Sequence, residues 1–315
     1  MLPGKHAYSH VNALSSAVQA YLNLKDEKYL RAAQNGIHMV MAQSYATGGW
    51  GPDEAFQEPG KGKLAESLHT THNTFETPCG AYGHFKITRY LLRITQDSRY
   101  GDSMERVLYN TVLGAWPIQP DGTSFYYSDY HMPAQKVWYR DKWPCCSGTL
   151  PQLSADYLIS TYFHSPRGVY VNLYVPSTLS WVQGGTKCEL KQVTAYPYDG
   201  QIGLEVSAAR PETFSIFLRI PEWANGATVM VNGKRGSAKV AAGTFAEVHR
   251  EWKNGDRIEL DLPLTMRLEA IDEQHPNQAA LLRGPLVLMA LSAETPAVKK
   301  AELLAARRES PTSHF

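Results

Sequence analysis

The hydrophobic positions of the 315-residue chain follow two different periods. In the first half, apolar residues recur three and four positions apart, a spacing that places them on one face of a helix. This spacing predicts helices in four stretches, the first of them a hairpin that breaks near Lys25: residues 10–43, 77–95, 99–113 and 150–163. In the second half, apolar and polar residues alternate, which is typical of half-buried strands.

The alternating segments begin at Gly168 and are separated by Gly, Asn and Pro turns. They read VYVNLYVPS, FSIFLRIPEW, ATVMVNGK and RIELDLP. Short strands of this kind, joined by tight turns, are typical of a β-sandwich. We therefore predict an α+β multidomain protein, with a helical domain over residues 1–165 and a β-sandwich domain over residues 166–315.

Two segments of the helical half follow neither period. Residues 44–77 are rich in Gly, Pro, Thr and His, and residues 120–149 are similarly mixed, so both are predicted to be irregular. Loops this long inside a compact domain are usually functional. Thr77 and Pro78 then mark a helix start, Thr77 as its N-cap, because proline suits the first turn of a helix.

Composition excludes several classes of partner. The net charge is +1 and the Lys and Arg residues are spread along the chain, so neither nucleic acid nor an anionic membrane is expected as a partner. No apolar run approaches the roughly 20 residues that span a bilayer, and Met1–His10 lacks the apolar core of a signal peptide. Localisation is left open. The 7 Trp and 18 Tyr residues suit a protein that stacks on sugars, although each is as readily a core residue.

The two irregular segments contain the residues with the most distinctive chemistry. Three cysteines and one of two glutamates would fill a tetrahedral zinc shell and leave one carboxylate over. These residues are Glu54, Glu76, Cys79, Cys145 and Cys146. The adjacent cysteine pair rarely forms a disulfide. Alternatively, the cysteines are small buried hydrophobic residues, which is the commonest role of a free cysteine.

Three motifs together resemble glycoside hydrolase family 127: GGWGPDEAF, FETPCGAYGHFKITRYL and WPCCSGTLPQLSADYL. The resemblance continues through RIPEWANGATVMVNGK and ALLRGPLVL, and so covers nearly the whole chain. It implies a retaining β-L-arabinofuranosidase that acts on a carbohydrate substrate. It also implies a catalytic (α/α)6 barrel followed by a β-sandwich.

The resemblance also implies a role for each site residue. Glu54 matches the general acid/base, and Cys145 matches the nucleophile. The implied ligands of Zn2+ are Glu76, Cys79, Cys145 and Cys146. His6 matches a family histidine that faces the sugar, while Tyr127, His72 and His131 are candidate contacts to sugar hydroxyls or, alternatively, packing and surface residues.

Two departures from the family keep alternatives open. FETPC has two residues between Glu and Cys where the family has one, so His69 or His72 is an alternative ligand to Glu76. Asp53 and Glu58 flank the expected acid. A hydrolase with a metal-bound water and a zinc-stabilised carbohydrate-binding or scaffold protein without turnover are the rival functions.

The second departure concerns the start of the chain. HAYSHVNALSSAVQAYL resembles a helix near the middle of the family barrel, so about half of the barrel helices are expected to precede it. We therefore expect the chain to behave as the C-terminal portion of such a protein, with an open apolar face, low activity alone and a tendency to form a homo-oligomer.

Overall fold

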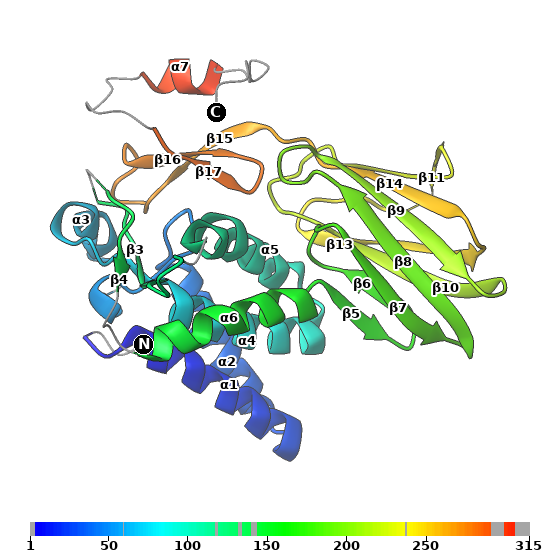
Figure 1. Cartoon of the computed structure of the whole chain (residues 1–315), viewed down its shortest axis with the longest axis horizontal. Coiled ribbons are helices and arrows are strands. Elements are labelled where there is room, and N and C mark those ends of the chain that lie inside the picture. The colour runs from blue at the N-terminus through cyan, green and yellow to red at the C-terminus, as the bar shows by residue number, and fades with distance from the viewer. Residues whose placement is uncertain are drawn as a thin grey trace.

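The computed structural model describes residues 4–58, 60–116, 119–131, 134–139, 144–236, 238–290 and 299–305. Helices occupy the first half of the chain and strands the second (Figure 1). Parts of the predicted segments, among them residues 1–3, 140–143 and 306–315, lie outside the described residues.

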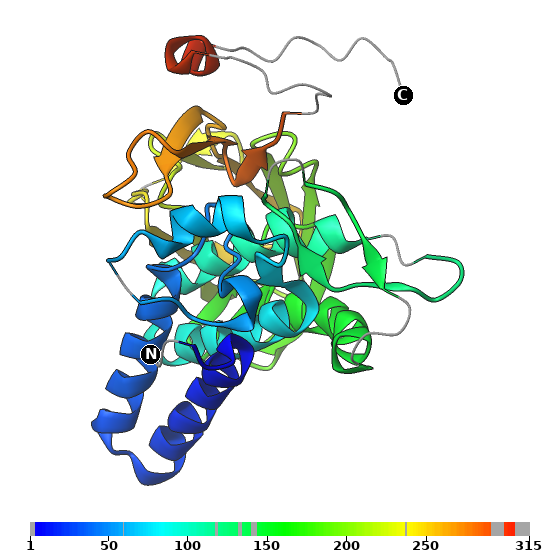
Figure 2. The same ribbon diagram turned by 90° about the vertical axis from the view of Figure 1, so that its left-hand side faces the viewer.

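The predicted helix hairpin is confirmed. It consists of α1 (Ala7–Leu24) and α2 (Glu27–Met41), and it projects from the rest of the molecule in Figure 2. Lys25 ends α1 in the left-handed conformation, and the Asp26 carboxylate caps α2 by accepting a hydrogen bond from the backbone N–H of Lys28 at 3.0 Å.

The central helix of this half is α4 (Thr77–Thr95), which contacts α1, α2, α5 (Ser98–Val107) and α6 (Pro144–Ile159). Because it has neighbours on several sides, most of its residues are buried. Thr77 is the first helical residue rather than the predicted N-cap, a position that Glu76 occupies. The Thr77 hydroxyl instead contacts the hydroxyl of Ser128 at 2.6 Å.

The structure corrects three other boundaries. The segment 44–77 is not wholly irregular. It contains a 3-10 turn, a helix and a short strand: η1 (Pro52–Glu54), α3 (Lys63–Thr70) and β1 (Phe75–Glu76). The helix predicted at 99–113 is α-helical only to Val107 and continues as a π-helical turn and a 3-10 turn: η2 (Leu108–Val112) and η3 (Leu113–Ala115).

The third correction concerns the cysteine pair. The helix predicted from residue 150 begins at Pro144, so Cys145 and Cys146 lie in its first turn rather than in a loop. A proline at the first helical position loses no hydrogen bond, because that N–H has no intrahelical partner. The proline and glycine of PCCSGT are typical of a loop, but a helix begins in this segment.

Two sheets form the larger part of the second half, and apolar residues from both share one core. The predicted strands are confirmed, and among the described residues the strand pairs are antiparallel except β6 with β10. The first sheet contains β13 (Thr244–Trp252), β10 (Glu212–Ile220), β6 (Gly168–Val171) and β5 (Tyr162–Ser165). The second contains β12 (Lys234–Arg235), β11 (Thr228–Val231), β14 (Asp256–Asp261), β9 (Gln201–Ala208), β8 (Thr186–Thr194) and β7 (Ser177–Gln183).

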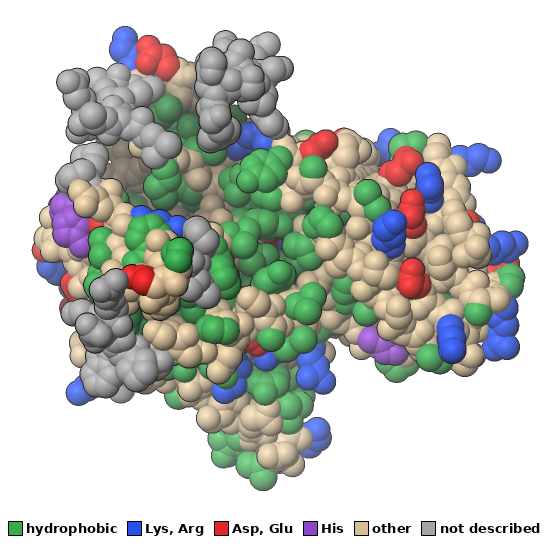
Figure 3. Space-filling view, in the orientation of Figure 1, with side chains coloured by type: hydrophobic (Ala, Val, Ile, Leu, Met, Phe, Trp, Pro, Cys, Tyr) green, Lys and Arg blue, Asp and Glu red, His purple; other side chains and the backbone are tan. Residues whose placement is uncertain are grey.

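A third, smaller sheet lies against the helical half near α5 (Figure 1). It consists of β15 (Met266–Ala270), β16 (Ala279–Arg283) and β17 (Leu286–Leu288), with α7 (Lys300–Ala305) beyond it. Arg106 of α5 forms a two-bond ion pair with Glu269 of β15, at 2.5 and 2.8 Å. Figure 3, drawn in the orientation of Figure 1, shows hydrophobic side chains gathered in the middle of the visible face, between the helices and the large sheets.

Buried charges join the helical half to the large sheets. Arg219 of β10 is fully buried and pairs with Asp102 and Glu105 of α5, the latter at 2.7 Å. Its Nε also donates to the backbone oxygen of Asn172 at 2.6 Å. Burial raises the pKa of Asp102 to about 6, although the charge of Arg219 opposes this shift. The two halves are therefore connected by a polar network as well as by apolar packing.

Candidate active site

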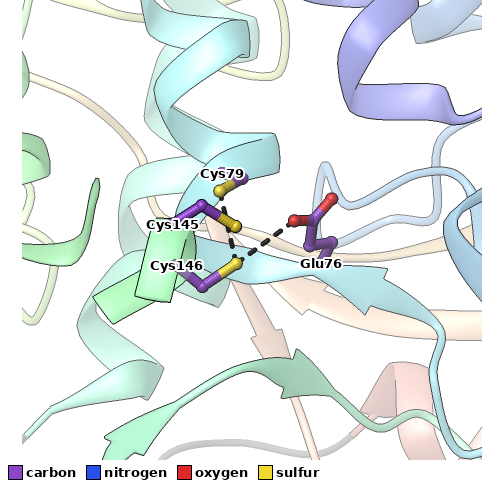
Figure 4. A group of neighbouring side chains, drawn as sticks. All are labelled: Glu76, Cys79, Cys145 and Cys146. Atoms are coloured by element: carbon purple, nitrogen blue, oxygen red, sulfur yellow. Dashed lines mark hydrogen bonds between the residues drawn. The ribbon is translucent and has the colours of Figure 1, made fainter. Parts of the chain in front are cut away.

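Three cysteines and one glutamate meet at the N-termini of two helices (Figure 4). Cys79 lies in the first turn of α4, and Cys145 and Cys146 lie in the first turn of α6. Glu76 ends β1, immediately before α4. One ligand atom from each of the four residues lies within 4.8 Å of all the others, so the residues predicted from sequence as metal ligands lie together.

The contacts inside this cluster are short. Cys146 Sγ donates to Glu76 Oε1 at 3.1 Å and to Cys79 Sγ at 3.3 Å. The hydroxyl of Thr149 lies 3.3 Å from Cys79 Sγ. Glu76, Cys79 and Cys146 are buried, whereas Cys145 is exposed. The one accessible thiol of the cluster is thus the one that sequence comparison assigns as the nucleophile.

Hydrogen bonding and burial shift the pKa values of the cluster in opposite directions. The hydrogen bond from Cys146 lowers the pKa of the Cys79 thiol, and the same bond raises the pKa of Cys146. Burial raises the pKa values of Cys145 and Glu76. Among the three thiols, Cys79 is therefore the one whose charged form the surroundings favour. The positive ends of two helix dipoles favour that charge.

The donor set fits a metal ion. Glu76 Oε2 is buried and has no hydrogen-bond partner among the described residues, an expensive state for a carboxylate oxygen unless a cation or a water satisfies it. Three thiols and a carboxylate are the donors that zinc accepts in a tetrahedral shell. The two residues between Glu76 and Cys79 do not separate their side chains, because the chain turns from strand to helix there.

The Glu54 carboxylate lies beside this cluster and is held by three side chains. The Tyr127 and Tyr126 hydroxyls both donate to its Oε1, at 2.5 and 3.2 Å. His6 Nε2 lies 3.3 Å from Glu54 Oε2, and at 3.9 Å it is beyond hydrogen-bond distance of Glu76 Oε2. Burial raises the pKa values of both tyrosines, which keeps them protonated as donors.

Local backbone geometry explains how these residues meet. Gly51 has a φ of 72°, and a Cβ built there would lie 2.6 Å from the Ala7 side chain, so the loop carrying Glu54 can approach α1 this closely only with glycine. Strand β1 pairs with β3 (Tyr127–Ser128) in a register that sets Glu76 opposite Tyr127. Glu54, Tyr127 and the cysteine cluster are thereby held close together.

The alternative residues take other positions. Asp53 Oδ1 accepts a hydrogen bond from the Thr71 hydroxyl at 2.5 Å, and Glu58 lines a separate cavity of about 300 Å³. His72 Nδ1 lies 2.8 Å from Asp129 Oδ2, and the ring of His131 lies 4.2 Å from that of His72. Within the described part of the chain, no candidate metal group includes Asp53, Glu58, His69 or His72.

Sequence reasoning missed several residues of the site. Tyr126, Tyr8 and Tyr139 pack around the cysteines, and Tyr126 is 3% exposed. Burial and the neighbouring acidic groups raise the pKa of Tyr8 to about 12. The run FYYSDY was a usable signal for Tyr126, because two adjacent tyrosines stood in a segment already singled out as functional. Nothing in the spacing indicated Tyr8.

Comparison with known proteins identifies the family. The family model of the β-L-arabinofuranosidase GH127 catalytic domain matches residues 1–157, and that of the GH127 middle domain matches residues 168–264. The chain therefore belongs to glycoside hydrolase family 127. A search of the curated proteins found no significant match. Among the described residues, no helix combines the length and apolar character needed to cross a membrane.

Three solved structures are similar over 90% of this chain. One is described as a glycoside hydrolase (27% identity, TM-score 0.74), one as a GH127 β-L-arabinofuranosidase from Geobacillus stearothermophilus T6 (26%, 0.74) and one as the GH127 β-arabinofuranosidase BT3674 (25%, 0.72). The match covers 51%, 46% and 47% of those chains respectively. The chain thus spans about half the length of these relatives.

Proposed function

We propose that this chain carries the catalytic centre of a retaining glycosidase that releases β-L-arabinofuranose or a related sugar. Cys145 is the nucleophile, Glu54 is the general acid/base, and His6 and Tyr127 contact the sugar. The observation that carries the proposal is that one exposed thiol, Cys145, and one held carboxylate, Glu54, each have a ligand atom within 4.8 Å of one of Glu76. The family membership supports the same assignment.

The residues around the cluster suit a bound zinc ion. Glu76, Cys79, Cys145 and Cys146 would hold it, and the buried Oε2 of Glu76, which has no hydrogen-bond partner among the described residues, supports that role. When bound, zinc would keep its cysteine ligands as thiolates at neutral pH. Cys145 would then be a nucleophile without a separate base to deprotonate it.

The reaction proceeds in two displacements. Cys145 Sγ attacks the anomeric carbon while Glu54 gives its proton to the glycosidic oxygen, so a C–S bond forms as the C–O bond breaks. Glu54, now a carboxylate, takes a proton from water, and the water oxygen displaces Sγ from the same carbon. Two inversions retain the configuration of the sugar. The hydrogen bonds from Tyr126 and Tyr127 hold Glu54 in place through both steps.

We also infer the architecture of the two halves of the chain. The helices α1, α2, α4, α5 and α6 would form one part of an (α/α)6 barrel, and the two large sheets a β-sandwich. The common core of these sheets supports the second inference. A domain boundary at residues 165/166 falls between the two family-model matches, although β5 (Tyr162–Ser165) precedes it and pairs with β6.

The test is hydrolysis of a β-L-arabinofuranoside by the purified chain, with the anomeric configuration of the first product followed by NMR and the metal content measured in the same sample. We expect retained configuration and zinc. A haloacetamide derived from the sugar should label Cys145 alone. Labelling elsewhere, or inverted product, would contradict the role of Cys145 and favour attack by an activated water.

A second candidate function is a zinc-stabilised carbohydrate-binding or scaffold protein without turnover. The observation that favours it is the donor set itself, because three thiols and one carboxylate at the starts of α4 and α6 also suit a structural zinc site that only stabilises the fold. Sugar binding and bound metal without turnover, in the same assay, would support this second function.

A further inference from the structure

A cavity of about 610 Å³ lies where α5, the segment after β10 and strand β15 of the third sheet meet. Its walls include Arg106 of α5, Trp223 and Arg267. Neither Glu54 nor any residue of the cysteine cluster is among the described residues that line it. Its volume is that of an ordinary small-molecule pocket, so the cavity is large enough for a small organic ligand.

Most of the charged side chains that line this cavity are already paired. The ion pairs are Arg106 with Glu269, Arg99 with Asp97, and Arg219 with both Asp102 and Glu105. Two lining residues, Arg267 and Glu222, form no ion pair with a described residue. Glu222 is exposed, whereas Arg267 is half-buried. Arg267 is therefore the half-buried charge of this wall that lacks a direct counter-ion among the described residues.

The Arg267 guanidinium is held on one side only. Its Nη1 donates to the backbone oxygen of Gly284 at 2.5 Å. Its Nε and Nη2 have no hydrogen-bond partner among the described residues. These two nitrogens form the side of the fork on which a carboxylate binds with two parallel hydrogen bonds. Burial and then the charge of Arg106 lower the pKa of Arg267, an effect that a bound anion would oppose.

Trp223 supplies a flat, partly buried wall beside this fork. The Arg267 guanidinium carbon lies 6.0 Å from the centroid of its ring, and the indole Nε1 donates to Glu105 Oε2 at 3.4 Å, which fixes the ring orientation. Gly284 has a φ of 53°, and a Cβ built there would lie 2.5 Å from the Leu264 side chain and 3.5 Å from the indole, so glycine allows this turn to pack here. An aromatic wall of this kind suits a ring in the ligand.

We infer that this cavity binds a small organic acid, with its carboxylate held by Arg267 and its ring packed against Trp223. The carboxylate supplies the counter-ion that the described residues do not provide. Because Glu222 and the acids around Arg219 add negative charge nearby, a single carboxylate suits the cavity better than a dianion. The inference is independent of the proposed function, since the cavity shares no described residue with the side chains that hold Glu54.

Calorimetric titration of the purified chain tests the cavity with two acids and their uncharged counterparts. Glucuronate and benzoate carry a carboxylate on a ring, while glucose and benzamide keep the ring and lack the charge. We expect at least one acid to bind about tenfold more tightly than its counterpart. Glucuronate would identify the ligand as a sugar acid, and benzoate as an aromatic acid. Binding of neither acid, or equal binding of acid and counterpart, would overturn the inference.

Variants then locate the bound acid. Arg267→Gln should weaken its binding about tenfold, because glutamine keeps a polar group but carries no charge and no fork. Trp223→Leu should weaken it by a smaller factor, and Glu222→Gln should leave it unchanged or strengthen it. Arg257→Gln is the matched control, since Arg257 lies on β14 and is 66% exposed.

Unchanged affinity in Arg267→Gln, with the circular dichroism of the parent chain, would overturn the assignment. The comparison of each acid with its uncharged counterpart uses the parent chain, so it decides the matter even if Arg267→Gln does not fold.

Discussion

The Cys146 thiol donates a hydrogen bond to the Glu76 carboxylate at 3.1 Å, although 70 residues separate the two in the chain. The contact joins the start of α6 to the end of β1. Cys146 also contacts Cys79 at the start of α4, so three elements meet at this thiol. Neither helix start would bring the four side chains together alone. The packing of α4 against α6 creates the cluster.

Replacement of one buried cysteine should remove the metal. We expect the chain, purified without added zinc, to contain about one zinc ion, and Cys146→Ser to lose most of it because a ligand and its buried contacts disappear. Cys188→Ser is the matched control, since Cys188 is also buried but lies in β8. Elemental analysis and thiol titration measure both. Four freely titrating thiols in the parent chain would contradict the site.

Replacement of the two side chains proposed as catalytic, Glu54 and Cys145, should have different effects. Made in a complete-length form of the protein, Glu54→Gln should lower kcat by roughly 10²–10⁴-fold with zinc retained, because it removes proton transfer but no ligand. Substrates with a good leaving group should recover part of that loss. Cys145→Ser should abolish turnover and weaken zinc retention as well.

The neighbouring carboxylates serve as controls for Glu54. Asp53→Asn and Glu58→Gln remove the same charge from residues that lie outside the site, and neither should reproduce the loss or its recovery with a good leaving group. A comparable defect in Glu58→Gln would move the acid/base role away from Glu54.

Sequence patterns predicted the parts of this molecule that depend on local spacing. The hairpin and the strands followed from periodicity, and the ligand set followed from motif resemblance. The start of α6 was missed because proline and glycine near Cys145 are typical of a loop. Proline is also common in the first turn of a helix, which is where Pro144 lies. Tyr8 and Tyr139 were missed because they reach the cysteines only through the packing of α1 and of the ribbon formed by β2 (Ser124–Phe125) and β4 (Trp138–Tyr139), which has no local signature.

The buried ion pairs between the two halves should make Arg219 the most sensitive arginine in the chain. Arg219→Ala removes the cation that pairs with the buried Glu105 and the partly buried Asp102, and we expect it to lower the free energy of unfolding by about 3–5 kcal/mol. Arg167→Ala breaks an exposed pair with Glu247 and should cost about 1 kcal/mol or less. Urea denaturation of both variants measures the difference. Equal, small effects would mean that solvent reaches the network.

Stability should depend on pH through His84. Burial lowers the pKa of His84 to about 4, and Trp50 donates to its Nδ1 at 3.3 Å while its Nε2 contacts Ser103 at 2.7 Å. The unfolded chain binds a proton at His84 near pH 6.5 and the folded chain only near pH 4, so stability falls as pH drops between these values.

The size of that fall follows from the shift. It should amount to about 3 kcal/mol, with no further change from this residue below pH 4. His84→Gln removes the titration, so unfolding measured at pH 7, 5.5 and 4.5 should show a shallower decline for the variant. Parallel curves for the two proteins would exclude His84 as the cause.

The outer surface of α6 should promote association. Leu158 and Ile159 are 58% and 56% exposed, and the carboxylate of Asp156 on the same helix is occupied by Arg89 at 2.5 Å. We expect the chain to form a homo-oligomer through this surface, and the double change of Leu158 and Ile159 to lysine to shift it toward monomer. Val182→Lys, on β7, is the control because Val182 is 60% exposed. Light scattering of a parent chain that stays monomeric at high concentration would contradict this.

Glu54 and the preceding Asp53 both adopt positive φ angles, 59° and 52°, which residues with a side chain rarely do. Glycine at position 54 would relieve about 1 kcal/mol of this cost and would remove the acid as well. Selection for thermal tolerance alone would therefore favour loss of Glu54, the residue proposed as the general acid/base. A screen that enriches heat-resistant variants without an activity step should recover Glu54→Gly, and the same screen with an activity step should exclude it.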